Sequence, residues 1–290
     1  MTEKPLDCWA DWLVSGRQRG MSDGQVRRLQ RNLNRLRDRV LRGARLRAGQ
    51  RLLDVGAGTG LLALDARRRV GPTGAAVALD VSVDALRQCA AQPAGADPAA
   101  PLHLVAGDAL RLPFREGAFG AAVTRSVLIY VADKAAAIAE LYRVLRPGGR
   151  ASIFEPINEV ESSRGDDFGL DLGALKPAHD RVAAHRRATW GHEQTMLGFD
   201  ERDLARWFAD AGFSSVRLTY EYGTGRRRAT RAEVAMLLRI RPNPSMMSYE
   251  EAARATLDGA ADGHLLSLAK LLTSQPLAGA SAAAYVTARK

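Results

Sequence analysis

Residues 52–60 read LLDVGAGTG, an apolar run that stops at Asp54 and breaks into three closely spaced glycines. An apolar run before a glycine-rich turn is typical of a buried strand, and residues 61–70 can form the helix that follows it. Glycines allow backbone N–H groups to approach a ligand closely, and a helix N-terminus attracts negative charge. The stretch therefore predicts a ligand-binding loop between a strand and a helix.

The spacing of these glycines, at positions 56, 58 and 60, narrows the class of ligand. A dinucleotide-binding loop has the pattern G-x-G-x-x-G, whereas this loop has G-x-G-x-G. A loop that cradles a triphosphate ends in Gly-Lys-Ser/Thr, and here Gly60 is followed by two leucines. The pattern disfavours a nucleoside triphosphate.

The same strand, loop and helix rhythm repeats along the first half of the chain. We expect strands at residues 51–55, 76–80, 102–105, 119–124 and 150–154, with helices at 61–70, 84–91 and 134–145. The RPGG turn at residues 146–149 should separate the last of these helices from the fifth strand. This alternation predicts an α/β fold with a doubly wound parallel sheet and right-handed crossovers.

The remaining segments predict additions to that core. Residues 6–14 and 22–42 carry helical patterns, residues 157–199 show no regular pattern, and helices are expected at 200–211, 231–240 and 249–272. Strands are expected at 216–222 and 282–290. We therefore divide the chain into an N-terminal helical lid (1–43), a ligand-binding core (44–156), a cap segment (157–199) and the C-terminal part of the core (200–290), with a helical insertion at about 230–273.

Composition and charge limit the class of protein. The chain has 290 residues, of which 46% are hydrophobic and 26% charged, as in ordinary soluble globular proteins. No apolar stretch approaches the roughly 20 residues needed to span a membrane. Cys8 and Cys89 have no metal-type or disulfide spacing, which predicts a cytoplasmic protein.

The net charge of +10 comes with abundant Arg and Ala, a composition typical of a GC-rich bacterial genome. No aromatic-and-basic motif supports a nucleic-acid partner.

Three carboxylates follow three successive predicted strands. Asp54, Asp80 and Asp108 lie at the carboxyl ends of the first, second and third strands, where ligands of open parallel sheets bind. Carboxylates repel phosphate but accept hydrogen bonds from ribose hydroxyls and amines. The ordered set indicates an adenosine ligand without phosphates.

Four motifs in this order, LLDVGAGTG, ALDVS, GDALRLPF and RVLRPGGR, closely resemble class I S-adenosylmethionine-dependent methyltransferases. The resemblance covers roughly residues 40–156. The motifs resemble those of the ubiquinone/menaquinone-biosynthesis-like branch, whose members methylate carbon, oxygen or nitrogen of small molecules. It implies a seven-stranded, mostly parallel Rossmann-like sheet and S-adenosylmethionine as the cofactor.

The resemblance also implies roles for individual residues. Residues at the glycine loop would line the methionine end of the cofactor, those after the second strand would hold ribose and adenine, and those after the third would face the adenine edge. Arg125 would place its backbone near the methionine amine. The implied cofactor-binding residues are Asp54, Gly56, Ala57, Gly58, Asp80, Val81, Asp108, Ala109 and Arg125.

Methyl transfer needs a base only when the acceptor must lose a proton. Glu155, at the end of the fifth strand, is our candidate catalytic base, with Tyr130, His179, His185 and His192 in flanking segments. The fourth strand ends in TRSVLIY rather than the Asn/Asp-Pro-Pro-aromatic tetrapeptide of amide and base-nitrogen methyltransferases. No clustered acids follow that strand, so a metal-dependent mechanism is disfavoured and no metal is expected.

The expected function is methyl transfer to a carbon, nitrogen or oxygen of a small organic molecule in bacterial secondary metabolism. The additions around the core resemble those of natural-product tailoring enzymes. Two alternatives stay open, an RNA methyltransferase that uses the basic surface and a cofactor-binding homologue that does not methylate, such as a cyclase. A homodimer is a further expectation.

Overall fold

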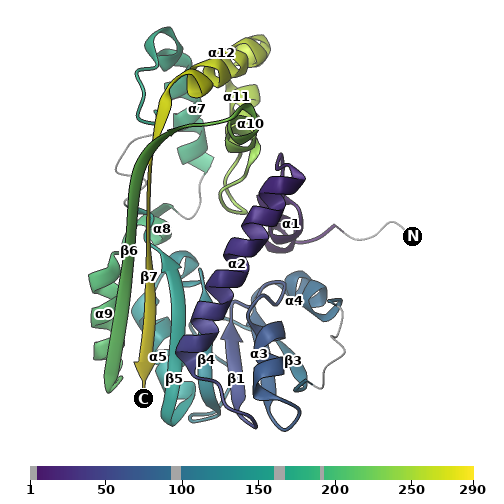
Figure 1. The fold of residues 1–290 in the computed structure, drawn as a ribbon, viewed down its shortest axis with the longest axis vertical. Helices are drawn as coiled ribbons and strands as arrows, with labels where there is room; N and C mark the ends of the chain where they lie inside the picture. Colours follow the sequence, from purple (N-terminus) through teal and green to yellow (C-terminus); the bar gives the residue numbers. More distant parts are fainter. Residues whose placement is uncertain (1–4, 93–98, 160–166, 190–192) are drawn as a thin grey trace.

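The structure is a computed structural model that describes residues 5–92, 99–159, 167–189 and 193–290 (Figure 1). Its centre is a seven-stranded sheet with the order β3-β2-β1-β4-β5-β7-β6. Only β7 runs antiparallel to its neighbours, β5 and β6. The strands are β1 (Arg51–Val55), β2 (Ala75–Asp80), β3 (Leu102–Ala106), β4 (Phe119–Arg125), β5 (Leu145–Pro156), β6 (Ser215–Arg228) and β7 (Pro276–Arg289). The predicted fold class is confirmed.

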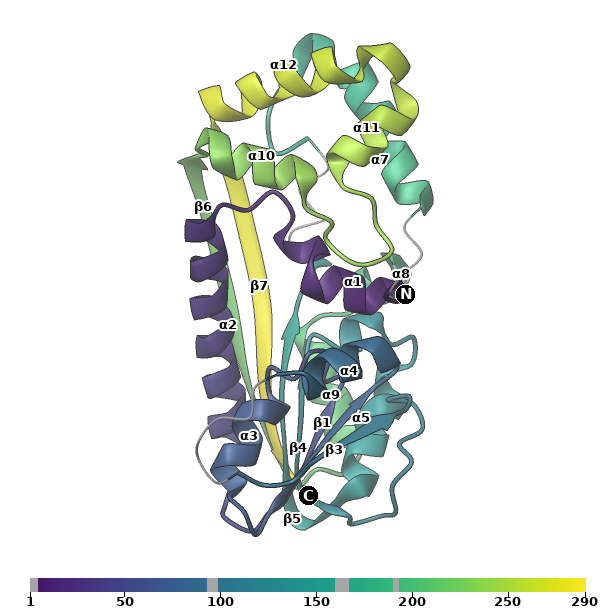
Figure 2. The same cartoon turned by 90° about the vertical axis from the view of Figure 1, so that its right-hand side faces the viewer.

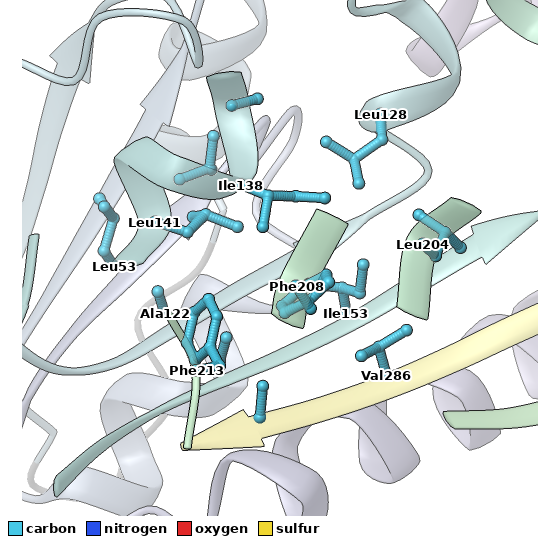
Figure 3. Close-up of a cluster of buried hydrophobic side chains, with 14 of the residues drawn as sticks. Leu53, Ala122, Leu128, Ile138, Leu141, Ile153, Leu204, Phe208, Phe213 and Val286 are labelled. Carbon is cyan, nitrogen blue, oxygen red and sulfur yellow. The ribbon is translucent and has the colours of Figure 1, made fainter. Parts of the chain in front are cut away.

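Helices cover both faces of the sheet. On one face lie α2 (Asp23–Ala44), α3 (Ala63–Val70) and α4 (Val83–Ala90), and on the other α5 (Lys134–Val144) and α9 (Glu201–Asp210). The larger core cluster fills the second face, where Ile138 of α5 and Phe208 of α9 pack on Ile153 of β5 (Figure 3). This arrangement leaves the carboxyl ends of the parallel strands as the edge at which a ligand can bind.

Strands β6 and β7 are both longer than their sequences predict. Each has fourteen residues, and they stay paired from Ser215↔Arg289 to Arg228↔Pro276. The expected strands, 216–222 and 282–290, cover only the parts that contact the core. The outer half of β6 is exposed and holds Gly223, Gly225 and three arginines, so it has no alternation of apolar and polar residues from which a strand could be recognised.

Beyond the sheet, four helices form a separate layer that we call the helical cap (Figures 1 and 2). They are α7 (Lys176–Thr189), α10 (Arg231–Arg239), α11 (Tyr249–Thr256) and α12 (Ala261–Ser274). They share an apolar core of their own, centred on Val182, Leu238 and Leu268. The cap is joined to the sheet by the long β6–β7 ribbon.

Two details of the cap differ from the sequence expectations. The segment expected to be irregular contains the fourteen-residue helix α7, whose pattern is weak because few of its residues are buried. The single helix expected at 249–272 is broken by the 3-10 turn η4 (Asp258–Ala260), where Asp258 has a φ of 45°. A left-handed residue cannot continue a right-handed helix, so α11 and α12 are separate.

The fifth strand also begins earlier than expected. It follows α5 directly at Leu145 and includes the RPGG stretch, with Gly148 at a φ of 75° and a register shift against β4 between Phe119 and Ala121. The turn is therefore an irregularity inside the strand rather than a separate connection.

At the N-terminus, α1 (Cys8–Val14) and the 3-10 turn η1 (Gly16–Gln18) precede α2. Ser22 begins α2 through a capping box with Gln25. Figure 2 shows α1 between the carboxyl edge of the sheet and the helical cap. No helix among the residues that the structure describes is long and apolar enough to cross a membrane.

Candidate functional site

A cavity of about 100 Å³ lies at the carboxyl ends of β1, β2 and β4. The core contributes the glycine loop and the residues that end these strands, and the segment Asp7–Gln18, which we call the lid segment, contributes the opposite wall. The lining residues are Trp9, Trp12, Leu13, Arg17, Asp54, Gly56, Ala57, Gly58, Thr59, Leu61, Leu62, Asp80, Arg125, Ser126 and Tyr130.

The glycine loop needs its glycines for conformation and for space. Gly56 and Gly58 have φ values of 66° and 53°, in the left-handed region that favours glycine. A Cβ on Gly58 would lie 2.9 Å from Leu13 Cδ1 in the lid segment, and one on Gly56 would overlap Val127 Cγ2. The loop backbone is therefore in close contact with both the lid segment and the residues after β4.

Asp54 brings a buried carboxylate to the floor of the cavity. The residue is 1% exposed, and its Oδ2 accepts a hydrogen bond from the Ala63 N–H at 2.9 Å. Its Oδ1 is buried without a hydrogen-bond partner in the described structure. Burial raises the pKa of Asp54 to about 8, with a smaller contribution from the charge of Asp80.

Asp80 joins the end of β2 to the glycine loop. Its Oδ2 accepts the Gly58 N–H at 2.7 Å and its Oδ1 accepts the Ser82 N–H at 2.9 Å. Burial raises the pKa of Asp80, while the two backbone N–H donors oppose that shift. Val81, the next residue, is 61% exposed and does not line the cavity.

The end of β4 supplies Arg125 and Ser126. Burial lowers the pKa of Arg125, and the acidic groups of Glu155, Tyr130 and Asp54 oppose that shift. No ion pair among the described residues involves Arg125. Ser126 has a φ of 54°, an uncommon conformation for a residue other than glycine, and its N–H donates to the Phe154 carbonyl at 2.8 Å. The chain thus turns sharply at the cavity wall.

Asp108 and Ala109 follow β3 at the same edge of the sheet but lie outside the cavity lining. Asp108 is exposed, and its Oδ1 accepts the Leu110 N–H at 2.9 Å. The carboxylate therefore stabilises its own turn. Of the residues predicted from the sequence, the structure brings Asp54, Gly56, Ala57, Gly58, Asp80 and Arg125 together around the cavity.

Glu155 is fully buried beneath the turn that follows β4. Its Oε1 accepts the N–H groups of Val127 and Leu128 at 2.9 and 3.1 Å, and its Oε2 accepts that of Ile129 at 3.3 Å. Burial raises the pKa of Glu155 to about 7, although these three donors oppose the shift. Glu155 does not line the cavity, and both of its oxygens are engaged with backbone.

The other candidate bases lie in different places. Tyr130 lines the cavity, and burial raises its pKa to about 12. His179 and His185 belong to α7 in the helical cap, where the His179 Nδ1 lies 2.8 Å from the Tyr249 hydroxyl. His192 lies outside the described residues. Within the described ranges, no group of three or more His, Cys, Asp or Glu side chains could hold a metal ion.

The lid segment is attached to both the core and the cap. Asp7 accepts the Ser82 hydroxyl at 2.7 Å, and the Trp9 ring meets Tyr130 edge-on with centroids 4.8 Å apart. The Trp12 Nε1–H donates to the Arg241 carbonyl at 2.9 Å. The sequence led us to expect a helical lid at residues 1–43, but the motifs named none of its residues for the cavity; the two tryptophans in a short N-terminal helix were the signal for this segment.

Known proteins resemble this chain in sequence and fold. Residues 53–153 match a family model described as a methyltransferase domain. The ubiquinone/menaquinone biosynthesis C-methyltransferase UbiE of Pseudomonas putida is 32% identical over 180 residues, which cover 60% of this chain and 68% of that protein. The demethylmenaquinone methyltransferase of Staphylococcus aureus is 29% identical over 184 residues, covering 63% and 75%.

Among solved structures, the protein YcgJ of Bacillus subtilis has a TM-score of 0.52 and 18% identity, covering 88% of this chain and 97% of that one. Protein BH2331 of Bacillus halodurans has a TM-score of 0.54 and 19% identity, covering 88% and 98%. At these identities the structural likeness shows the fold alone. The sequence relatives show more: the chain belongs to the class I S-adenosylmethionine-dependent methyltransferases, in the small-molecule branch that contains the ubiquinone/menaquinone biosynthesis methyltransferases.

Proposed function

We propose that the cavity beneath the lid segment is where this methyltransferase binds S-adenosylmethionine, and that it methylates a carbon, nitrogen or oxygen of a small organic molecule in bacterial secondary metabolism. The observation that carries the cavity assignment is the Asp54 Oδ1, a buried atom without a hydrogen-bond partner in a residue that lines the cavity together with the glycine loop. A buried polar atom without a partner is costly unless a ligand supplies one.

The residues around the cavity fit the chemistry of this cofactor. The left-handed Gly56 and Gly58 leave backbone close to the ligand space without a side chain in the way. Asp54 and Asp80 present acidic oxygens that suit a phosphate poorly but can accept hydrogen bonds from an ammonium and from ribose hydroxyls. We assign the amino-acid end of the cofactor to Asp54 and the ribose to Asp80. The exposed Val81 would contact the adenine, with Asp108 and Ala109 at its far edge.

When bound, S-adenosylmethionine supplies an electrophilic methyl group on a sulfonium. The protein then needs to orient the acceptor and exclude water. Trp9, Trp12 and Tyr130 give the cavity an aromatic wall, which favours a flat or apolar acceptor. A buried Tyr130 with a pKa of about 12 stays protonated at neutral pH and can donate a hydrogen bond to the acceptor.

We propose a positioning role for Glu155 in place of the base that the sequence suggested. Its carboxylate holds three N–H groups of residues 127–129, and Val127 packs against Gly56 of the glycine loop. A carboxylate engaged in this way has no free oxygen with which to remove a proton from an acceptor. The acceptor would therefore be a group that is already nucleophilic, such as an amine, a phenolate or an acidic carbon.

Calorimetry on Asp80→Ala tests the cofactor assignment. Loss of the charge-assisted bonds to ribose should weaken binding of S-adenosylhomocysteine by about 1–3 kcal/mol. Asp210→Ala is a control, because that exposed carboxylate ends α9, lies outside the cavity lining and should leave the affinity unchanged. Unchanged affinity in a folded Asp80→Ala protein would show that the cofactor does not bind in this cavity.

Formation of S-adenosylhomocysteine across a panel of small acceptors tests the reaction. Turnover of amines, phenols or quinols would support the proposal. Turnover of RNA alone would identify an RNA methyltransferase, and cofactor binding without any product would identify a homologue that does not methylate. Both of these results would contradict the proposed substrate class.

A further inference from the structure

Two buried polar atoms without a hydrogen-bond partner belong to residues that line the same cavity, one an acid and the other a base. One is the Asp54 Oδ1 on the floor, and the other is the Arg17 Nε on the wall formed by the lid segment. The first can accept a hydrogen bond and the second can donate one. A single ligand that carries a cation and an anion close together would satisfy both.

The environment of Arg17 is unusual for an arginine. Burial lowers its pKa to about 10, and the positive charge of Arg125 lowers it further. No ion pair in the described parts of the chain involves Arg17. Arg19, two residues later, instead pairs with Glu251 at 3.2 Å near the surface. Arg17 therefore lies near another cation and forms no ion pair with an acid among the described residues.

An unbalanced buried guanidinium destabilises a protein, because it loses solvation without gaining a partner. A carboxylate offsets this cost well, because the planar guanidinium can donate two parallel hydrogen bonds to it. The repulsion between Arg17 and Arg125 also falls when an anion lies near both. The site thus favours a ligand with a carboxylate at this corner of the cavity.

We propose that Arg17 binds the α-carboxylate of the cofactor's amino-acid tail, while the Asp54 Oδ1 accepts a hydrogen bond from its ammonium. This inference rests on the proposed function, since it places the tail of S-adenosylmethionine in the cavity. It gives the lid segment a direct role in cofactor binding, in addition to covering the acceptor.

The cavity is too small to admit the cofactor unless the lid segment moves outward. Pockets that hold ligands of this size have volumes of about 300–1,000 Å³, whereas this cavity has about 100 Å³. Leu13 and Arg17 both lie on the wall that would have to move outward for the cofactor to enter. Arg17 would then draw the lid segment back over the bound tail.

The carboxylate could instead belong to an acidic acceptor, and two probes separate these sources. S-adenosylhomocysteine has the amino-acid tail, whereas methylthioadenosine has the same nucleoside without it. Calorimetry should be carried out with both probes on the wild type, Arg17→Gln, Arg17→Lys and, as a matched control, Arg19→Gln. Thermal unfolding of each variant establishes that it is folded.

We expect Arg17→Gln to weaken binding of S-adenosylhomocysteine by about 10- to 100-fold, the range for a charge-assisted pair. Methylthioadenosine should bind Arg17→Gln and the wild type within about twofold, and Arg17→Lys should retain part of the selectivity for the tail. Arg19→Gln should change neither affinity by more than about twofold, because exposed ion pairs contribute little.

Three results would overturn the inference. Equal losses for both probes would mean that Arg17 only supports the fold. Unchanged affinities with a raised KM for an acidic acceptor would place the carboxylate on the acceptor, and unchanged affinities with unchanged KM would leave Arg17 without a ligand. Failure of the wild type to bind S-adenosylhomocysteine would instead contradict the proposed function itself.

Discussion

The two regions of the molecule treat their buried polar groups differently. In the helical cap, the Tyr249 hydroxyl lies between two buried histidines, 2.8 Å from His179 Nδ1 and 3.0 Å from His264 Nε2. At the carboxyl edge of the sheet, the Asp54 Oδ1 and the Arg17 Nε are buried without partners. The cap also holds a buried nitrogen without a hydrogen-bond partner, the Nε2 of His185 in α7. The sheet edge differs because its two such atoms, one from an acid and one from a base, belong to residues that line one cavity.

This difference indicates which groups stabilise the fold and which await a ligand. Paired buried groups contribute to a unique packing, so the Tyr249 hydroxyl and the two histidine nitrogens beside it need nothing from outside the chain. Unpaired ones are retained at a cost that only a binding partner offsets. We therefore expect changes at the sheet edge to alter ligand binding, and changes in the cap to alter stability alone.

A rise in pH should lower stability through the sheet edge and raise it through the cap. The change through the sheet edge should be larger than the effect of any substitution described below. Asp54 and Glu155 have pKa values raised to about 8 and about 7 in the fold. Their contribution is complete below the unfolded pKa, near 4, and is lost as pH rises through 7 and then 8. We expect urea unfolding to report a loss on the order of 7 kcal/mol between about pH 5 and pH 9, because the two raised pKa values together span about five pH units of that range. Asp54→Asn should flatten this slope, and a flat wild-type profile would contradict it.

The cap should respond to acid. Burial, and next the charge of His179, lower the pKa of His264. A lowered folded pKa means that this contribution is complete above the unfolded value of about 6.5 and is lost as pH falls through the folded pKa. Hydrogen-exchange protection factors, which correct for the slower intrinsic exchange in acid, should therefore fall in α11 and α12 below about pH 6, and equal protection factors at pH 5 and pH 8 would contradict the prediction.

The next largest effect should be the difference in stability between alanine variants of two glycines, one at the sheet edge and one in the cap. A Cβ on Gly56 would overlap Val127 at a φ of 66°, whereas one on Gly259 in the cap would meet nothing within 4 Å. We expect Gly56→Ala to lower the free energy of unfolding by about 2–4 kcal/mol and Gly259→Ala to change it by less than about 0.5 kcal/mol. Equal urea midpoints for the two variants would show that the glycine loop is not tightly packed.

Glu155→Gln separates a positioning role from a base. The amide keeps the shape but turns a donor toward one of the three backbone N–H groups, so stability should fall by about 1–3 kcal/mol. Turnover should change by only a few-fold, with KM raised and with the same pH profile. A loss of about 100-fold or more in turnover with full stability would restore Glu155 as the base.

Tyr249→Phe should have the smallest effect on stability, and that effect should be confined to the cap. The variant loses the hydroxyl that both histidines contact, which should lower the free energy of unfolding by about 1–2 kcal/mol. Affinity for S-adenosylhomocysteine should stay within about twofold, because none of the described cavity residues contacts this group. A large loss of affinity would mean that the cap and the cofactor site are coupled.

The sequence predicted the sheet edge far better than the cap. The strands and helices up to residue 156 could be recognised because burial on both faces gives short apolar runs, and because Gly56, Asp80 and their neighbours form ordered motifs. The outer half of β6 and helix α7 could not, since their residues are largely exposed and have no strong period.

The candidate site, like the fold, was predicted from sequence only where local motifs mark its residues. Glycine and strand-end motifs predicted Asp54, Gly58 and Asp80 at the cavity, because backbone topology alone brings them together. Arg17 reaches the cavity only through the packing of the lid segment, and nothing local marks it among the chain's many arginines. The contacts of Glu155 depend on the turn at 127–129, which the sequence does not specify.

Hydrogen exchange of the full chain, with and without S-adenosylhomocysteine, tests the central claim most directly. The lid segment lies over the glycine loop and shares the cavity with it, so exchange should slow in residues 7–18 and 56–63 when the cofactor product binds. Helix α12 in the cap should exchange at the same rate in both states. Protection of α12 with no change in the lid segment or the glycine loop would contradict the account.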